Sequence, residues 1–228
     1  MYIKRYINIS NFKMQINIEI PSSLKEIELR QYKAYIKALN KYSDNNTKLR
    51  LKMMEIFCNI PYDNAIKFKA KDVTRITNRL SKLLSDTPEL VMKFKMGDTT
   101  FGFIPKLDDM SFGEYIDLDS NISDWESVNK AMAVLYRPID KEKGQFYTIR
   151  DYEGHIYHDA MNSMPLDAVI GSIVFFYRLG NDLSQSMMKY LEGEIQMDSM
   201  QLQALEENGV GINLFTHSLK ETLRDLKM

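Results

Sequence analysis

The sequence has little cysteine, and this scarcity limits the kinds of protein it can be. Cys58 is the only cysteine among 228 residues, which excludes a disulfide framework and suits a reducing compartment. No apolar run approaches about 18 residues, so the sequence predicts no membrane-spanning segment. Residues 1–12 lack a long apolar stretch, so we expect no secretory signal. With 44% hydrophobic and 27% charged residues, the composition excludes wholesale disorder and collagen-like repeats.

Familiar catalytic motifs are absent as well. The sequence has no GxxxxGKS/T or GxGxxG phosphate-binding pattern and no GxSxG nucleophile elbow. His155 and His158 lie among carboxylates that could hold a metal, but Gly154 argues against the rigid helix that this spacing needs, so we interpret them as surface histidines. Cys58 follows Phe57 in an apolar stretch, and we expect a buried, inert thiol. The sequence therefore predicts no catalytic residue, no metal site, no cofactor and no enzyme activity.

The net charge of −1 conceals a strong asymmetry along the chain. Residues 1–95 hold 19 Lys and Arg against 9 Asp and Glu, a net charge of +10, whereas residues 96–228 hold 11 against 22, a net charge of −11. The basic part could bind a polyanion, or dock against the acidic part of its own chain or of a neighbouring copy in a ring. Lys-rich helices with solvated faces are a third reading. The aromatic residues are not interleaved with the basic ones, which disfavours a platform for single-stranded nucleic acid.

Apolar periodicity predicts a hairpin and three helices in the first part of the chain. Alternation over residues 14–20 and 25–29, joined by a turn, predicts a β-hairpin. From Gln31 the spacing becomes helical, and a second helix, capped by Asn46 or Thr47, is expected to continue to Pro61. Asp72 is expected to cap a third helix. The basic residues of that helix lie largely opposite its apolar face, which makes them candidate interaction residues: Arg75, Arg79 and Lys82.

A second hairpin and a further helix are predicted in the second part. Residues 90–104 alternate around Gly97-Asp98 and predict the hairpin, and residues 107–118 predict short helical turns. A helix carrying Trp125 is expected to run to Tyr136 and to stop at Pro138. Arg137, at the end of that helix, is expected to serve its C-terminal carbonyls and is a further candidate interaction residue.

The rest of the second part is predicted to be a loop followed by helices. Residues 139–160 are expected to form a loop with one strand around 146–149, and residues 166–190 a long helix. A further helix is expected over residues 216–226, of the kind that docks on a partner. The apolar residues of the helical segments after the second hairpin are expected to lie in the core, including Phe112, Tyr115 and Trp125.

Together these patterns predict an α+β protein that is mainly helical, with two small β-hairpins. The chain divides into a basic part, residues 1–88, and an acidic part, residues 89–228. Each part reads as a hairpin followed by an apolar stripe with tyrosines, an order consistent with internal duplication of a hairpin-plus-helix unit.

Methionine is abundant, with 15 residues. Met fills irregular gaps in cores and also forms adaptable contact surfaces. Both readings apply to the Met-rich C-terminal region, where four residues are candidates for an interaction surface: Met187, Met188, Met197 and Met200.

One stretch is more distinctive than its periodicity. It contains Phe103-Ile-Pro-Lys-Leu-Asp-Asp-Met-Ser-Phe-Gly-Glu-Tyr-Ile-Asp-Leu-Asp119, Asp124-Trp125 and Lys130-Ala-Met-Ala-Val-Leu-Tyr-Arg-Pro-Ile139, and continues with residues 151–154, 164–166 and 175–179. This order resembles virion-morphogenesis proteins of tailed bacteriophages, including crAss-like phages and some marine phages. Residues 21–30 are similar to the start of tail-assembly or baseplate-hub chaperones.

The resemblance implies a non-enzymatic structural or cargo protein of a tailed-phage virion, associated with the tail, neck or portal region. Its partners would be other virion proteins, and it would be present in multiple copies, in a ring or another symmetric assembly. It would occur in the virion and, during assembly, in the host cytoplasm. Two alternatives stay open: a tail-assembly chaperone, and an internal virion protein that contacts DNA non-specifically through the basic part.

Overall fold

The computed structural model describes residues 5–6, 17–144 and 146–193, and these form two compact units that we describe separately. Unit 1 comprises the described residues up to Asp86 together with Asp159–Asp167. Unit 2 comprises Thr87–His158 and residues 168–193. The sequence prediction divided the chain after residue 88 and did not anticipate that residues 159–167 return to unit 1. The predicted class, α+β and mainly helical, is confirmed.

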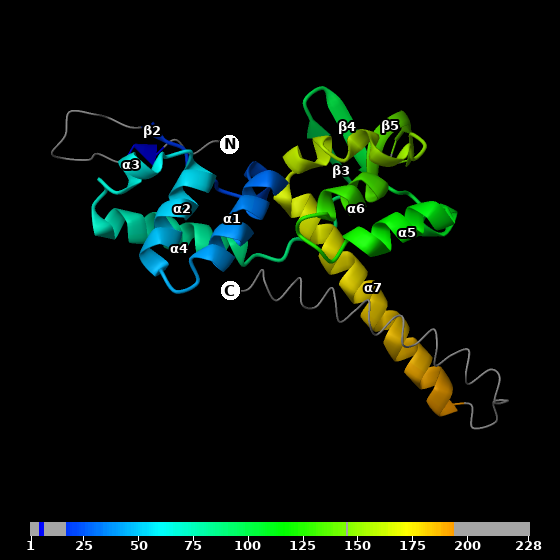
Figure 1. The fold of residues 1–228 in the computed structure, drawn as a ribbon. Coiled ribbons are helices and arrows are strands. Elements are labelled where there is room, and N and C mark those ends of the chain that lie inside the picture. Colours follow the sequence, from blue (N-terminus) through cyan, green and yellow to red (C-terminus); the bar gives the residue numbers. More distant parts are fainter. Residues whose placement is uncertain (1–4, 7–16, 145, 194–228) are drawn as a thin grey trace. The chain divides into compact units, whose positions relative to one another are not determined.

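Unit 1 is helical, and α2 contacts its neighbouring helices on several sides (Figure 1). Its elements are β1 (Arg5–Tyr6), β2 (Asn17–Ile18), the 3₁₀ turn η1 (Leu24–Glu26), α1 (Leu29–Lys41), α2 (Asn46–Cys58), α3 (Tyr62–Ala65), α4 (Ala70–Leu84) and the 3₁₀ turn η4 (Ala160–Ser163). The three predicted helices are present. Asn45, rather than Asn46 or Thr47, caps α2 through its side chain. Asp72 does not cap α4, because the N-cap position is Lys69 and Asp72 lies inside the first turn, two residues after Ala70.

The first predicted hairpin is wrong. The hydroxyl and N–H of Ser22 both donate to the Glu26 carboxylate, at 2.7 and 2.9 Å, and close the chain into η1 where a second strand was expected. The backbone beyond this turn then pairs elsewhere: Leu166 N–H donates to the Ile27 carbonyl at 2.8 Å, and Leu29 N–H to the Met164 carbonyl at 2.9 Å. β2 pairs with β1 instead. Without the first hairpin, the predicted hairpin-plus-helix duplication loses its basis.

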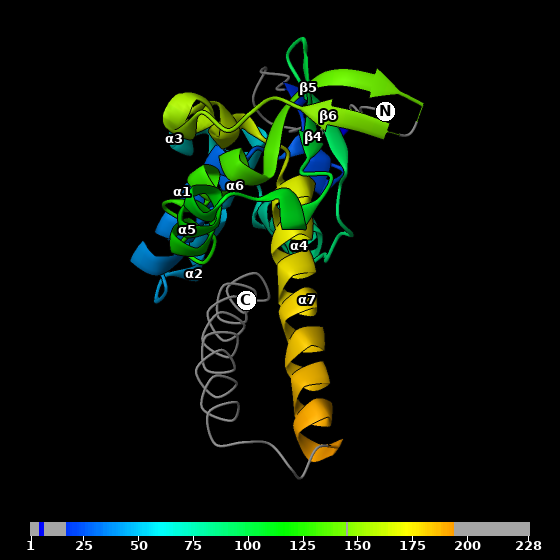
Figure 2. The same ribbon diagram turned by 90° about the vertical axis from the view of Figure 1, so that its right-hand side faces the viewer.

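Unit 2 consists of a four-stranded antiparallel sheet and the helices packed on it (Figure 2). The strands follow one another in the order β3 (Lys93–Met96), β4 (Thr99–Phe103), β5 (Tyr136–Lys143) and β6 (Phe146–Ile149). The other elements are the 3₁₀ turns η2 (Leu107–Asp109) and η3 (Gly154–Tyr157), and the helices α5 (Phe112–Asn121), α6 (Val128–Leu135) and α7 (Leu166–Gly193). The second predicted hairpin is confirmed, with Gly97 in the left-handed conformation (φ +59°) that the turn requires.

The structure corrects the end of the helix that was expected to carry Trp125. α6 begins only at Val128, and after Leu135 the chain turns directly into β5, so the region predicted as helix end and loop is the third strand of the sheet. The contacts of Tyr136 hold the start of this strand on unit 2. Its ring packs against Phe94 and Phe103, and its hydroxyl donates to the Val91 carbonyl at 2.7 Å.

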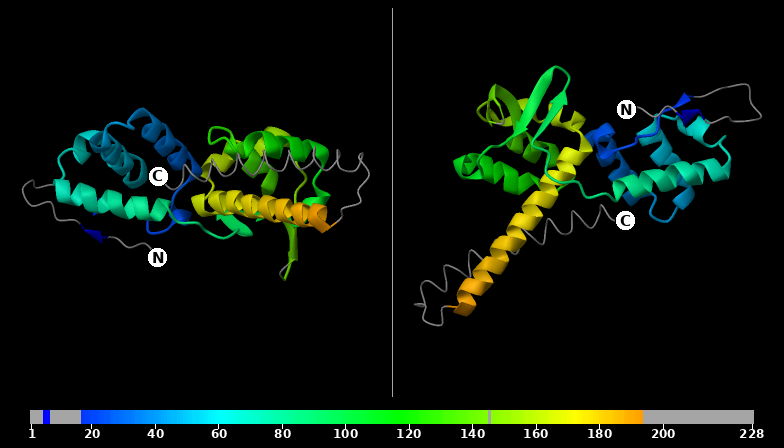
Figure 3. Two further views of the ribbon diagram at one scale, coloured as in Figure 1. Left: turned by 90° about the horizontal axis from the view of Figure 1, so that it is seen from below. Right: turned by 180° about the vertical axis from the view of Figure 1, so that it is seen from behind.

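The long helix predicted over residues 166–190 is confirmed as α7. Its first half packs on the sheet, where Phe175 and Phe176 contact Phe103. Its second half extends beyond the other elements of unit 2 (Figure 3). Within the described residues, no helix is both long enough and apolar enough to cross a bilayer.

Candidate functional site

The most distinctive surface feature of unit 2 is an apolar groove of about 540 Å³ between α5 and α7. Several of its side chains are unusually open to solvent for their type: Phe112 is 77% exposed, Tyr115 55% and Leu183 47%. The groove is lined by Leu107, Met110, Phe112, Tyr115, Leu118, Asp119, Phe176, Leu179, Gly180 and Leu183. An apolar groove lined by exposed aromatic and aliphatic side chains is a candidate binding site. We call this surface the α5–α7 groove.

Phe112 and Tyr115 are therefore not core residues, contrary to the sequence prediction, whereas Trp125 is buried as predicted. The face of α5 that packs on unit 2 carries Glu114 and Leu118, spaced at i and i+4, and both are buried. Phe112 and Tyr115 lie off this face, and their side chains line the groove instead of the core.

A capping box fixes the start of α5. Ser111 N–H donates to Glu114 Oε2 at 2.7 Å, and Glu114 N–H donates to Ser111 Oγ at 3.3 Å. This reciprocal pair is the Ser-x-x-Glu pattern at a helix N-terminus, and it satisfies two backbone donors that would otherwise have no intrahelical partner. It sets the position from which Phe112 and Tyr115 project.

The same glutamate ties α5 to the sheet. Glu114 Oε1 lies 2.9 Å from Arg137 Nη1, and both side chains are more than nine-tenths buried. Arg137 is thus a buried partner on β5 and does not serve the carbonyls at the end of a helix, as the sequence reasoning expected.

Both members of this ion pair also line a polar cleft of about 630 Å³. Arg137, Tyr147 and Tyr152 contribute to its lining. The Tyr152 hydroxyl donates to Asp117 Oδ2 at 2.8 Å, which attaches the chain after β6 to α5. Burial and, secondarily, this hydrogen bond raise the pKa of Tyr152 above its usual value, so the hydroxyl stays protonated as the donor.

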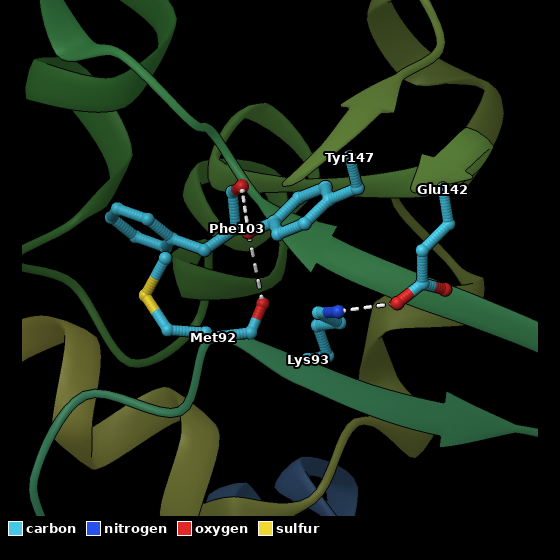
Figure 4. A network of polar contacts seen from close by, with 5 residues as sticks. All are labelled: Met92, Lys93, Phe103, Glu142 and Tyr147. Carbon is cyan, nitrogen blue, oxygen red and sulfur yellow. Dashed lines mark hydrogen bonds and ion pairs between the residues drawn. The ribbon is translucent and has the colours of Figure 1, made fainter. Parts of the chain in front are cut away.

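Tyr147 holds the outer strand on the sheet (Figure 4). Its hydroxyl donates to the Phe103 carbonyl at 2.7 Å and lies 3.3 Å from that of Met92. Its ring covers Gly102, where a Cβ atom would lie only 2.4 Å from Tyr147 Cε2. Lys93 adds an ion pair to Glu142 across the sheet. Since Gly102 is paired with Arg137 in the β4–β5 register, this arrangement also helps to fix Arg137 opposite α5.

The residues that the sequence marked as interaction candidates lie in different places. Arg75, Arg79 and Lys82 are on α4 of unit 1; Arg75 and Lys82 are exposed and Arg79 is half-buried. Arg75 also pairs with Asp72 at 3.1 Å. Two of the methionine candidates, Met187 and Met188, lie in the last part of α7; Met197 and Met200 fall outside the described residues, as does the helix predicted over 216–226.

The histidine-rich stretch forms the short 3₁₀ turn η3 and its flank. His155 is exposed and His158 is half-buried. In the parts of the chain that the structure describes, no group of three or more His, Cys, Asp or Glu side chains is arranged to hold a metal ion.

Comparison with known proteins adds no relative: the chain matches no protein-family model, no curated protein and no solved structure.

Proposed function

We propose that the protein is a non-enzymatic structural or cargo protein of a tailed-phage virion, associated with its tail, neck or portal region, and that it binds another virion protein through the α5–α7 groove. One observation carries the proposal. Every residue that lines the groove, apart from Gly180 and Leu183, falls within the segments that resemble phage virion-morphogenesis proteins, residues 103–119 and 175–179. The resemblance and the exposed apolar side chains thus coincide on one face, and an apolar groove is typical of a binding site.

Mass spectrometry of gradient-purified particles tests this proposal. We expect peptides of this chain in the particles, at a ratio to a known tail protein that stays constant across the gradient fractions. A phage carrying Tyr115→Ser should incorporate less of the protein. A phage carrying Phe146→Ser is the matched control, because Phe146 is 75% exposed on β6 and does not line the groove. Particles that contain the other structural proteins but no peptide of this chain would contradict the proposal.

The openness of the groove favours one alternative, a tail-assembly chaperone. A chaperone must present its apolar surface before the client arrives, and the exposure of Phe112 and Tyr115 fits this requirement. The same experiment separates the two functions. A chaperone would be recovered from infected cells in complex with a tail protein and would be absent from finished particles.

A further inference from the structure

On each wall of the α5–α7 groove, the lining residues are spaced like those of a helix face that packs on another helix. On α7 the lining residues Phe176, Leu179, Gly180 and Leu183 follow the i, i+3, i+4, i+7 pattern of one helical face. On α5, Phe112 and Tyr115 are spaced at i and i+3. Two helices that each present such a face leave room for a third helix to pack its own ridges between them.

The length of the groove limits the size of the occupant. The lining of α7 runs from Phe176 to Leu183, a step of about 10 Å along the helix axis at about 1.5 Å per residue. The lining of α5 runs over the same number of residues, from Phe112 to Asp119. An occupant therefore makes contact over about two turns, with apolar anchors at i, i+3 or i+4, and i+7.

The charge around the groove limits the occupant further. Residues 107–121, which form η2 and α5, contain five acidic side chains and no basic one. Glu114 is neutralised by Arg137 and Asp109 lines the polar cleft, but Asp119 lines the groove itself and is exposed. On the α7 wall, Arg178 is engaged by the Glu89 carboxylate at 2.8 and 3.0 Å. The rim next to α5 is thus negative and favours positive charge on the occupant.

We propose that the α5–α7 groove binds a short amphipathic helix of a partner protein, about two to three turns long, with Lys or Arg flanking its apolar face. This inference rests on the proposed function and gives the chemistry of the partner. A second copy of the chain is disfavoured as the source. Within the described residues, the apolar stripes of α1, α2 and α4 are buried in unit 1, and α5, which does expose apolar residues, carries the same negative charge as the rim.

Fluorescence polarisation with the purified full chain tests the inference. The probe is a labelled peptide of about 12 residues with Leu at i, i+3, i+4 and i+7 and Lys on the flanking positions. The comparison probe is the same peptide with Glu in place of every Lys. We expect the Lys peptide to bind at least about tenfold more tightly than the Glu peptide, and this difference to shrink as salt screens the charges.

Variants of the groove locate the binding. Tyr115→Ser or Leu183→Ser should weaken binding of the Lys peptide at least about tenfold, whereas Phe146→Ser, at an even more exposed apolar residue outside the groove, should leave it unchanged. Asp119→Asn should weaken the Lys peptide and not the Glu peptide. The fluorescence of Trp125, buried in unit 2, reports whether each variant is folded.

Three results would overturn the inference. Equal affinity for the two peptides would remove the charge preference, and full affinity of Tyr115→Ser would place the binding elsewhere. If Leu219→Asp in the full chain raised the affinity for the Lys peptide about tenfold or more, residues 194–228 of the same chain would be competing for the groove. None of these results depends on phage particles, so absence of the protein from particles would refute the proposed function and leave the peptide measurement standing.

Discussion

Glu114 Oε1 lies 2.9 Å from Arg137 Nη1, and the two side chains are only 8% and 7% exposed. Glu114 also accepts a hydrogen bond from the N–H of Ser111 at 2.7 Å. One carboxylate thereby closes the N-terminus of α5 and joins that helix to β5 of the sheet. The helix held in this way is one wall of the α5–α7 groove, so the ion pair supports the surface through which we propose that the protein binds its partner.

Removing one member of this pair should destabilise unit 2 strongly. Arg137→Met leaves a buried carboxylate without its counter-charge, and we expect a loss of about 3–5 kcal/mol in the free energy of unfolding. Glu114→Gln should also lower the free energy of unfolding. Because Gln can still form the capping box, this variant removes only the ion pair. The double variant should lose less than the sum of the two single variants, because it buries no unpaired charge. Urea unfolding followed by the fluorescence of Trp125, the only tryptophan, reports on unit 2.

Arg150→Met is the control for this prediction. Arg150 lines the same polar cleft but is exposed, and its loss should change the stability by no more than about 0.5 kcal/mol. If Arg137→Met were as mild as Arg150→Met, the ion pair would not be what holds α5 on the sheet.

Gly171 should tolerate no side chain. A Cβ at this position of α7 would lie 2.5 Å from the carbonyl oxygen of Glu89, a backbone atom that cannot rotate away. Alanine favours a helix over glycine by about 1 kcal/mol, yet we expect Gly171→Ala to destabilise unit 2 by about 1–3 kcal/mol because α7 and residues 89–90 must separate. Thermal unfolding followed by Trp125 fluorescence measures the change.

Gly113→Ala provides the opposite case. No atom lies within 4 Å of a Cβ built on this glycine of α5, so the helix gains propensity without a clash. We expect a change between zero and about 1 kcal/mol in favour of the folded state. Equal effects of the two substitutions would show that the close contact at Gly171 does not limit the packing of α7.

Much of the secondary structure follows from local patterns. Apolar periodicity predicts α1, α2, α4 and α7, and Gly97 marks the β3–β4 turn, because these elements bury a face whose spacing can be read directly from the chain. Two of the failures share one cause, which is pairing between segments far apart in the sequence. Ile27 and Leu29 alternate like a strand, but their backbone groups bond to residues 164–166. Tyr136–Lys143 follows a helix, and its pairing with β4 makes it a strand.

The groove could not be located from the sequence for a related reason. Phe112 and Tyr115 are of residue types expected in a core, but the burial of Glu114 on the neighbouring face of α5 turns them outward. A buried glutamate is unusual enough that sequence reasoning assigns it to the surface. Its partner Arg137, 23 positions later, gives no local signal of the ion pair. The Ser111-x-x-Glu114 pattern was the available clue, because it fixes where the helix starts and so which residues share a face.

Charge reversal on α4 should disturb assembly if the basic part contacts an acidic surface of another subunit. Arg75→Glu together with Arg79→Glu changes the charge of the helix by four units, and we expect incorporation into particles to fall at least about fivefold. Lys25→Glu with Lys67→Glu makes the same change at exposed positions away from α4. Similar incorporation of both double variants and the unmodified protein would leave α4 as a solvated face. A salt-sensitive gel shift with DNA, lost in the α4 variant alone, would instead favour the DNA-contacting alternative.

Cys58 should be inert in the folded protein and should make the stability of unit 1 depend on pH. Burial in α2 raises the pKa of its thiol from 9.0 to about 12, so the thiolate that reacts with Ellman's reagent is scarce at pH 8. The folded state holds the proton more tightly than the unfolded state. The resulting stabilisation is complete below pH 9.0 and falls between pH 9.0 and about 12, by about 1.4 kcal/mol per pH unit. Urea unfolding of the unmodified chain and of Cys58→Ala at pH 8 and pH 10 should show this difference, whereas parallel pH dependence, or rapid labelling without urea, would mean that the thiol reaches solvent.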